Sequence, residues 1–424
     1  MKNKWRSTRG MDVAQLDDAI LAGLARDGGL YVPEQFPELS IDQFYEFDNL
    51  VDFSRELLAS FFKNSKLVIN RDFCQEVFHF PMPITGLTEN SYVLELFHGP
   101  TLSFKDFGAR FFAQCLQNLV SEVKTKVLVA TSGDTGSAVA SALHGRSGIE
   151  GIILFPKDKI SLRQQMQITC WSDNITALAV KGNFDQCQQL VKSACSKSGD
   201  GVRLTTANSI NIARLLPQMV YYAYSSIQLE KIHHETVNFI VPGGNLGNVT
   251  ACYWAQTLGF PINEILIANN ANKVLSDYLS SGIYEARPSI NTLANAMDVG
   301  DPSNLERLID LFGDFNSLEH HLNALSVFDE EIKEAITDCY NKYKYILCPH
   351  TATAYHRLQR LDSDKIWVIA ATAHPVKFND LIEPLLGLEI PVPEQLKIMM
   401  ERTSTYQEIE AQDVGLKKYL NLER

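Results

Sequence analysis

The chain has 424 residues, of which 45% are hydrophobic and 21% are charged. This is the composition of an ordinary globular protein, long enough for two or three domains around a large core. The formal net charge of -12 argues against a nucleic-acid partner, because phosphate backbones bind basic surfaces. A small anionic substrate is compatible with that charge, since backbone dipoles and a few cations can bind one.

The cysteines and histidines show no metal-binding pattern. The 8 cysteines contain no C-x-x-C pair, and the 10 histidines contain no H-E-x-x-H spacing. We therefore expect reduced thiols and no metal site. The basic segment Met1 to Arg9 has no apolar stretch behind it, and apolar runs such as Ile366 to Ala371 are too short to span a bilayer. The sequence predicts a cytoplasmic protein with no signal peptide and no membrane partner.

The first part of the chain has a helical character. Amphipathic patterns over residues 12–24 and 44–62 predict helices, and few runs before residue 81 resemble strands. Pro81-Met82-Pro83 has the composition of a linker. We expect a mainly helical N-terminal domain over residues 1–80, followed by a catalytic core over residues 81–424.

In the core, short apolar runs rich in β-branched residues alternate with turn residues and helical patterns. The predicted strands cover residues 92–97, 126–131, 149–155, 237–241, 262–268 and 365–371. Strands that alternate with helices at this spacing indicate βαβ units and mostly parallel sheets covered on both faces. The expected fold class is α/β, with a charged helical tail after about Pro391.

Three junctions between a strand, a loop and a helix carry candidate chemistry, and the first contains Lys105. This lysine lies among apolar residues that include Phe104, Phe107 and Phe111. A desolvated setting favours the neutral amine, which is a nucleophile suited to a Schiff base. Taken alone, the segment also fits a lysine at a helix start whose stem covers apolar surface while its amine reaches water.

The second junction runs from Thr131 to Ser137, between a predicted strand and a helix predicted over residues 138–143. Small hydroxyl residues and glycines expose backbone N–H groups at the positive end of a helix. Such a helix end binds a phosphate or a carboxylate. A helix start that is simply capped by serine or aspartate is the alternative.

The third junction runs from Pro242 to Asn248 and precedes a helix predicted over residues 249–258. Its spacing is not G-x-G-x-x-G, and it lacks the Gly-Lys-Ser/Thr ending of a P-loop. It fits either a backbone site for one phosphate or a tight turn. A buried lysine together with two anion sites favours a cofactor with one phosphate and one aldehyde, and a substrate with its own anionic groups.

Motifs over nearly the whole chain resemble the threonine synthase family of pyridoxal-phosphate (PLP) enzymes. They lie in Ser7 to Gly10, Ile20 to Ala25, Asp27 to Pro33, Glu95 to Asp106, Asn208 to Arg214, Asn295 to Gly300 and Thr372 to Pro375. The resemblance implies the tryptophan-synthase-β-like fold (fold type II), with two α/β subdomains around a cofactor cleft and a chain that crosses between them. It also implies a monomer or homodimer that converts O-phospho-L-homoserine and water to L-threonine and phosphate, the last step of threonine biosynthesis.

The resemblance further assigns roles to single residues. Lys105 would carry PLP as a Schiff base and act as the catalytic base. The other implied cofactor contacts are Asp134 at the ring hydroxyl, where related enzymes have Asn, Thr372 at the pyridine nitrogen, and Gly244, Asn245, Leu246, Gly247 and Asn248 at the phosphate. The implied substrate contacts are Thr131, Ser132, Thr135, Asn208, Ser209 and Arg214, of which the last three would hold the substrate phosphate. Cys348 stands where the family usually has an acidic residue, so a contact of that carboxylate would be lost.

Two alternatives stay open from the sequence. A PLP-dependent lyase of the serine or threonine dehydratase kind would share the lysine and the glycine-rich loop. It would not need Asn208, Ser209 and Arg214 as a phosphate site. A non-catalytic relative would bind PLP or a phosphorylated ligand, and the presence of both Lys105 and Arg214 counts against it.

Overall fold

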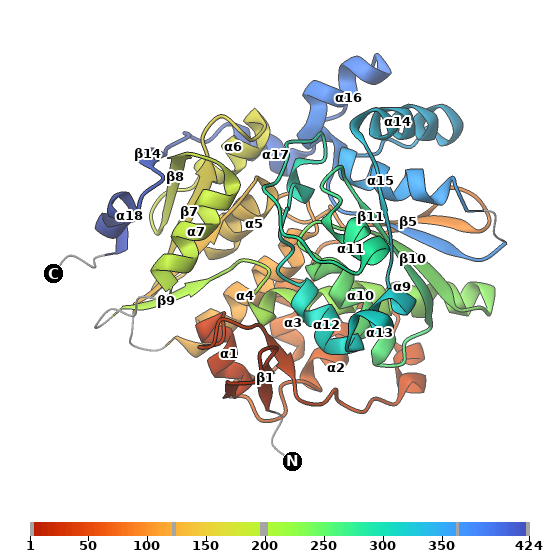
Figure 1. The fold of residues 1–424 in the computed structure, drawn as a ribbon, viewed down its shortest axis with the longest axis horizontal. Coiled ribbons are helices and arrows are strands. Elements are labelled where there is room, and N and C mark those ends of the chain that lie inside the picture. Colours follow the sequence, from red (N-terminus) through yellow and green to blue (C-terminus); the bar gives the residue numbers. More distant parts are fainter. Residues whose placement is uncertain (1–3, 121–123, 196–201, 362–363, 421–424) are drawn as a thin grey trace.

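The computed structural model describes residues 4–120, 124–195, 202–361 and 364–420, and the described strands form three sheets (Figure 1). The largest sheet has the order β12-β11-β10-β13-β5-β4. Its strands are β4 (Ile84–Gly86), β5 (Ser91–Glu95), β10 (Val237–Pro242), β11 (Ile262–Asn269), β12 (Asn323–Ser326) and β13 (Trp367–Ala371). All neighbours are parallel except β4 and β5. Every residue of β10 and β13 is buried, as expected for central strands covered on both faces.

A second sheet has the order β14-β8-β7-β6-β9, and all its neighbours are parallel. Its strands are β6 (Thr125–Ala130), β7 (Ile149–Pro156), β8 (Ile175–Lys181), β9 (Arg203–Thr206) and β14 (Gln407–Glu410). The edge strand β14 comes from the C-terminal tail, which the sequence predicted as helical. The two sheets confirm the predicted α/β class, and the chain crosses between them more than once.

The N-terminal segment contains a small antiparallel sheet of order β2-β1-β3, beside its helices. The elements are β1 (Trp5–Ser7), β2 (Val13–Ala14), α1 (Leu16–Ala22), β3 (Tyr31–Pro33), the 3-10 helix η1 (Ile41–Glu46), α2 (Leu50–Ala59) and α3 (Arg71–Val77). The prediction of one helix over residues 44–62 was wrong, because the chain breaks between η1 and α2. Asn49 caps α2 by accepting a hydrogen bond from the Asp52 N–H.

Helices cover both large sheets (Figure 1). They are α4 (Lys105–Leu119), α5 (Asp134–Leu143), α6 (Leu162–Thr169), α7 (Phe184–Cys195), α8 (Ile212–Leu215), α9 (Gln218–His233), α10 (Gly247–Thr257), α11 (Val274–Ser281), η2 (Asn295–Met297), α12 (Leu305–Phe312), α13 (Phe315–His321), α14 (Asp329–Tyr343), α15 (Pro349–Leu358), η3 (Pro375–Phe378), α16 (Asn379–Leu386), α17 (Glu394–Met400) and α18 (Asp413–Leu420). Among the described residues, no helix combines the length and the apolar character needed to cross a bilayer.

The loops that follow four strands bring the candidate residues together. The chain after β5 leads to Lys105, and the chain after β6 leads to Thr131. The glycine-rich loop follows β10, and Thr372 follows β13 directly. The parallel strands β5, β10 and β13 end at one edge of the largest sheet, so their loops meet there. The loop after β6, in the second sheet, lines a cavity together with Lys105.

Arg307 connects the N-terminal segment to this region. Its side chain is fully buried and donates hydrogen bonds to the Tyr31 carbonyl in β3. It also donates to the carbonyls of Ser209 at 3.2 Å and Ile210 at 2.8 Å. A buried guanidinium with several carbonyl acceptors holds these segments in a fixed relation. The segment that leads into α8 is therefore anchored to β3.

Candidate active site

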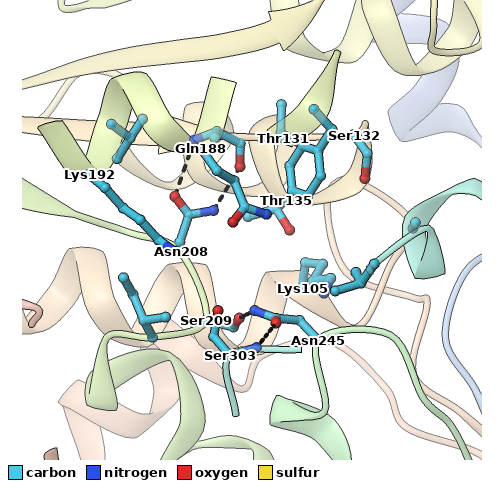
Figure 2. Close-up of a pocket in the computed structure, with 16 residues that line it drawn as sticks. Lys105, Thr131, Ser132, Thr135, Gln188, Lys192, Asn208, Ser209, Asn245 and Ser303 are labelled. Carbon is cyan, nitrogen blue, oxygen red and sulfur yellow. Dashed lines mark hydrogen bonds between the residues drawn. The ribbon is translucent and has the colours of Figure 1, made fainter. Parts of the chain in front are cut away.

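Two adjoining cavities are lined by all the residues to which the resemblance assigned a cofactor or substrate contact. The hydroxyl cavity is lined among others by Lys105, Thr131, Ser132, Thr135, Asn208, Ser209 and Asn245 (Figure 2). The loop cavity is lined among others by Lys105, Asp134, Ser209, Arg214, Gly244, Asn245, Leu246, Gly247, Asn248 and Thr372. Lys105, Ser209 and Asn245 belong to both cavities. The amine of Lys105 therefore stands where the two cavities meet.

Lys105 is the first residue of α4, and its Nζ lies 4.4 Å from the centroid of the Phe104 ring. Withdrawal from water lowers the pKa of Lys105 to about 8, and the positive charge of Arg214 lowers it further, while Asp134 opposes both effects. A substantial fraction of the amine is neutral near pH 7 to 8. This agrees with the desolvated setting expected from the apolar neighbours.

A buried carboxylate holds the start of α4. Asp106 accepts hydrogen bonds from the Thr101 N–H at 2.9 Å and from the Thr101 hydroxyl at 2.8 Å. A Cβ at Gly99 would lie 2.5 Å from Asp106 Oδ2, so this turn requires glycine. Burial raises the pKa of Asp106 to about 6, although the two bonds from Thr101 oppose the effect. These contacts fix the turn that presents Lys105.

The glycine-rich loop leads into α10 without a side-chain cap. Leu246, the N-cap residue, adopts φ +60°, and no side chain accepts from the first turn at this position. A Cβ at Gly244 would lie 3.0 Å from Met297 Cα, so the backbone passes close to η2. Uncapped N–H groups at a helix N-terminus are donors for an anion. The loop therefore has the form of a phosphate site.

Two buried donors in the loop cavity lack a partner among the described residues. They are Asn248 Nδ2 and Arg214 Nε. Asn248 Oδ1 accepts from the hydroxyls of Tyr221 and Tyr222, which orients the amide. Buried donors are normally satisfied, so unpaired ones beside an uncapped helix start indicate a missing anionic ligand. The residues of this cavity fit a cofactor that carries a phosphate.

Arg214 and Asn208, which the resemblance assigns to the same phosphate, line different cavities of the site. The helix α8 has only four residues, and Arg214 lines the loop cavity while Asn208 lines the hydroxyl cavity. The Arg214 side chain donates to the Ala207 carbonyl. Asn208 donates to the Ala130 carbonyl at 2.7 Å and accepts from the Ala130 N–H at 3.2 Å (Figure 2). Asn208 thus fixes the end of β6.

The loop before α5 forms one wall of the hydroxyl cavity. The Thr131 hydroxyl accepts from the N–H groups of Gly133 at 2.9 Å and Gly136 at 2.8 Å, which holds the turn. Ser132 and Thr135 are half-buried and face the cavity (Figure 2). Their hydroxyls are placed to bind a polar ligand.

Asp134 lies in the adjoining wall of the loop cavity and is buried. Burial raises the pKa of its carboxyl, but the charge of Lys377 and the hydrogen bonds from Lys377 and Gln164 outweigh this effect, so the pKa is below its ordinary value. The Nζ of Lys377 lies 2.7 Å from Asp134 Oδ1. Asp134 is therefore an ionised group in the cavity wall.

Thr372 and Cys348 are linked through Thr351. Cys348 is the N-cap residue of α15, and its Sγ accepts from the Thr351 N–H at 3.4 Å. The Thr351 hydroxyl in turn accepts from the Thr372 N–H at 3.3 Å. The thiol of Cys348 thus caps the helix at the position where the resemblance implies an acidic residue in other members of the family. The backbone of Thr372 is held by this helix start.

Several residues of the site were not singled out from the sequence. They are Gln164, Gln188, Lys192, Ser303, Asn304, Arg307 and Lys377. Lys377, like Lys105, is a lysine among apolar residues. It lies between Val376 and Phe378, after the His374-Pro375 motif. Lys192 extends from α7 toward Asn208 in Figure 2, and its sequence context is an ordinary amphipathic helix. No local pattern identifies it.

Comparison with known proteins agrees with this geometry. Residues 84–372 match the family of pyridoxal-phosphate dependent enzymes, residues 4–71 match the threonine synthase N terminus, and residues 351–420 match the threonine synthase C-terminal family. Threonine synthase of Haemophilus influenzae is 40% identical over 383 residues, which are 89% of this chain and 90% of that protein.

Solved structures show the same relation over the whole chain. The crystal structure of threonine synthase from Escherichia coli has a TM-score of 0.92 at 32% identity and covers 99% of both chains. PLP-bound threonine synthase from Brucella melitensis has a TM-score of 0.90 at 32% identity, covering 99% of this chain and 98% of that one. This chain belongs to the threonine synthase family of pyridoxal-phosphate-dependent enzymes.

Proposed function

We propose that this protein converts O-phospho-L-homoserine and water to L-threonine and inorganic phosphate, with PLP bound covalently to Lys105. The observation that carries the proposal is the position of the Lys105 amine between two polar cavities. The loop cavity suits the cofactor, and the hydroxyl cavity suits a second anionic molecule. Ser209 and Asn245 line both, so each ligand would lie within reach of the other.

The cofactor would be held by the walls of the loop cavity. Backbone N–H groups of the loop from Gly244 to Asn248, together with Asn248 Nδ2, would bind its phosphate. Thr372 would hydrogen-bond the pyridine nitrogen, and Asp134 would accept from the ring hydroxyl. When bound, PLP supplies an electron sink for the charge that develops as a proton leaves the substrate α-carbon.

Lys105 would move that proton. Its Nζ is a base with a pKa of about 8, close to physiological pH, which suits general acid–base catalysis. The neutral amine takes the α-proton, and the resulting ammonium returns a proton later in the cycle. Phe104 beside the Nζ limits the access of water to the amine.

Substrate binding would use both cavities. Thr131, Ser132 and Thr135 would hold the carboxylate through hydroxyl and backbone groups of the turn before α5. Ser209 and Arg214 would bind the substrate phosphate, and Asn208 would hold the segment in place. The net reaction breaks the bond between the γ-carbon and the phosphate oxygen and one C–H bond of the β-carbon. The hydroxyl from water is added to the β-carbon, a proton is added to the γ-carbon, and phosphate leaves.

The setting of the reaction is part of the proposal. The substrate is a small molecule, and the enzyme would act in the cytoplasm as a monomer or homodimer. An acidic chain with a net charge of -12 has no general attraction for anionic surfaces. Local donors would therefore have to provide the affinity for the phosphate.

The proposal is tested by comparing two reactions of the purified holoenzyme. We expect L-threonine and phosphate to form from O-phospho-L-homoserine in equal amounts. We expect little 2-oxobutanoate from L-threonine, which is the reaction of a dehydratase. If 2-oxobutanoate formation is the faster reaction, the dehydratase interpretation replaces the proposed one. If neither reaction occurs and PLP is bound, a non-catalytic role replaces it.

A further inference from the structure

Lys377 and Asp134 form a buried ion pair behind the wall of the loop cavity. Lys377 lies in η3 and is 0% exposed, and its Nζ stands 2.7 Å from Asp134 Oδ1. The same Nζ donates to the Thr101 carbonyl at 2.9 Å. Asp134 lines the loop cavity, whereas Lys377 lines neither of the two cavities. The direct contact of the Lys377 amine with a side chain that lines the cavity is therefore the ion pair with Asp134.

Only one oxygen of the Asp134 carboxylate, Oδ1, contacts other side chains in the part of the chain that the structure describes. Besides Lys377, Oδ1 is contacted by Gln164 Nε2 at 3.1 Å. Within the part of the chain that the structure describes, Oδ2 has no hydrogen-bond partner. A Cβ at Gly133 would lie 2.5 Å from Gln164 Nε2, so the glycine makes room for Gln164. The protein therefore holds the carboxylate through Oδ1, and Oδ2 can accept a hydrogen bond from a ligand.

We infer that Lys377 is a positioning residue, which keeps Asp134 ionised against the cofactor ring and so maintains a negative charge beside Lys105. The inference rests on the proposed placement of PLP next to Asp134. An unpaired carboxylate in a buried wall takes up a proton, because burial penalises its charged form. Without Lys377, Asp134 would become a neutral acid, and the negative charge near Lys105 would be lost.

No other cation in the described part of the chain lies in contact with Asp134. The further ionisable groups around the pair are Lys105, Arg214, Asp106, His350, Cys348 and His374. Burial lowers the pKa of His350 to about 4, so its ring is neutral near pH 7. Its Nε2 accepts from the Ala296 N–H at 3.0 Å, which fixes the ring. His350 therefore cannot replace the charge of Lys377 at neutral pH.

The test is a pH titration of the visible absorbance of PLP bound to Lys105, in the holoenzyme without substrate. A negative charge on Asp134 favours the protonated form of the nitrogen that links Lys105 to the cofactor. We therefore expect Lys377→Met to lower the midpoint by about one pH unit. Asp134→Asn removes the same charge and is expected to lower the midpoint equally. The double variant D134N/K377M is expected to have the same titration midpoint as Asp134→Asn, since both changes act through one carboxylate.

Lys126→Met is the matched control, because Lys126 is also buried and bonds the Tyr419 carbonyl away from both cavities. It is expected to keep the wild-type midpoint. The double variant leaves no unpaired buried charge, so it keeps the test possible if Lys377→Met does not fold. A wild-type midpoint in Lys377→Met, or a double variant that titrates about one unit away from Asp134→Asn, would overturn the inference. An absence of the absorbance band from the wild type would instead contradict the placement of PLP on Lys105.

Discussion

The amide of Asn245 donates a hydrogen bond to the Ser209 hydroxyl across 2.7 Å. This bond joins the glycine-rich loop to the segment that leads into α8, and both residues line both cavities. The Ser303 N–H donates to Asn245 Oδ1 at 2.6 Å, which fixes the direction of the amide. The Ser209 O–H is then left to donate to a ligand. Binding in one cavity is therefore coupled to the geometry of the other.

Ser209→Ala should weaken the binding of both PLP and substrate. The substitution removes a donor to the substrate phosphate and the acceptor that holds Asn245. We expect the PLP dissociation constant and the KM for O-phospho-L-homoserine each to rise about 3- to 10-fold, the effect of one hydrogen bond. Cofactor titration and steady-state kinetics measure the two constants. Ser276→Ala in α11, whose hydroxyl contacts Ser326, is the control. A rise in only one constant would show that the bond does not couple the cavities.

Gly244→Ala should weaken PLP binding more than Gly247→Ala does. A Cβ at Gly244 would lie 3.0 Å from Met297 Cα, and this backbone contact can be relieved only by moving the loop. A Cβ at Gly247 would meet its nearest atom, Asn304 Nδ2, at an ordinary 3.4 Å. We expect at least a tenfold loss of PLP affinity for Gly244→Ala, about 1.4 kcal/mol. Thermal unfolding of both apoproteins serves as the folding control. Equal PLP affinities in the two variants would mean that the loop is only a turn.

Substitution of Arg214 distinguishes between binding of the substrate phosphate and binding of the cofactor phosphate. If it binds the substrate phosphate, Arg214→Ala should lower kcat/KM by about one to two powers of ten, the loss of a charge-assisted contact. PLP affinity should then change little, and Arg214→Lys should recover only part of the activity, because an ammonium cannot form the bidentate contact. Phosphate release and PLP occupancy are measured together. A large loss of PLP affinity would assign Arg214 to the cofactor phosphate, in agreement with its place in the loop cavity.

The capture of PLP by the apoprotein should depend on pH. The neutral Lys105 amine is the reactive form, so the rate should rise with pH around the Lys105 pKa of about 8. Arg214 lowers this pKa and Asp134 raises it. The profile should therefore move to higher pH in Arg214→Met and to lower pH in Asp134→Asn. Stopped-flow absorbance gives the rates, with exposed Arg71→Met as the control. Unmoved profiles in both variants would rule out this electrostatic control of Lys105.

The strands of the core could be predicted because their apolar, β-branched runs form mostly buried strands. The predicted runs at 237–241 and 262–268 agree with β10 and β11 to within one residue at each end. The strands of the N-terminal sheet have only two or three residues, too few to show an alternating pattern. β14 was missed because its pairing with β8 joins segments more than 200 residues apart. The domain boundary at residue 80 stays a prediction.

The site could be predicted where the signal lies within one loop. Lys105 and the segment from Gly244 to Asn248 each follow a strand, and the structure brings them to one cavity. Contacts between distant segments had no such signal. The pair of Asp134 and Lys377 and the bond from Arg307 to Tyr31 depend on how the two sheets and the N-terminal segment pack. The resemblance assigned Asn208 and Arg214 to one phosphate, and the structure places them in the walls of two adjoining cavities.

The most direct test of the central claim is the fate of oxygen from labelled water in the reaction of the wild type and of Lys105→Ala. Wild-type holoenzyme supplied with O-phospho-L-homoserine in H₂¹⁸O should form threonine and phosphate in equal amounts, with the label in the threonine hydroxyl. Lys105→Ala should lose both products and the visible absorbance of the bound cofactor. Label found in phosphate instead of threonine would indicate simple phosphatase chemistry. That outcome, or undiminished turnover by Lys105→Ala, would contradict the proposed role of Lys105 and the proposed function with it.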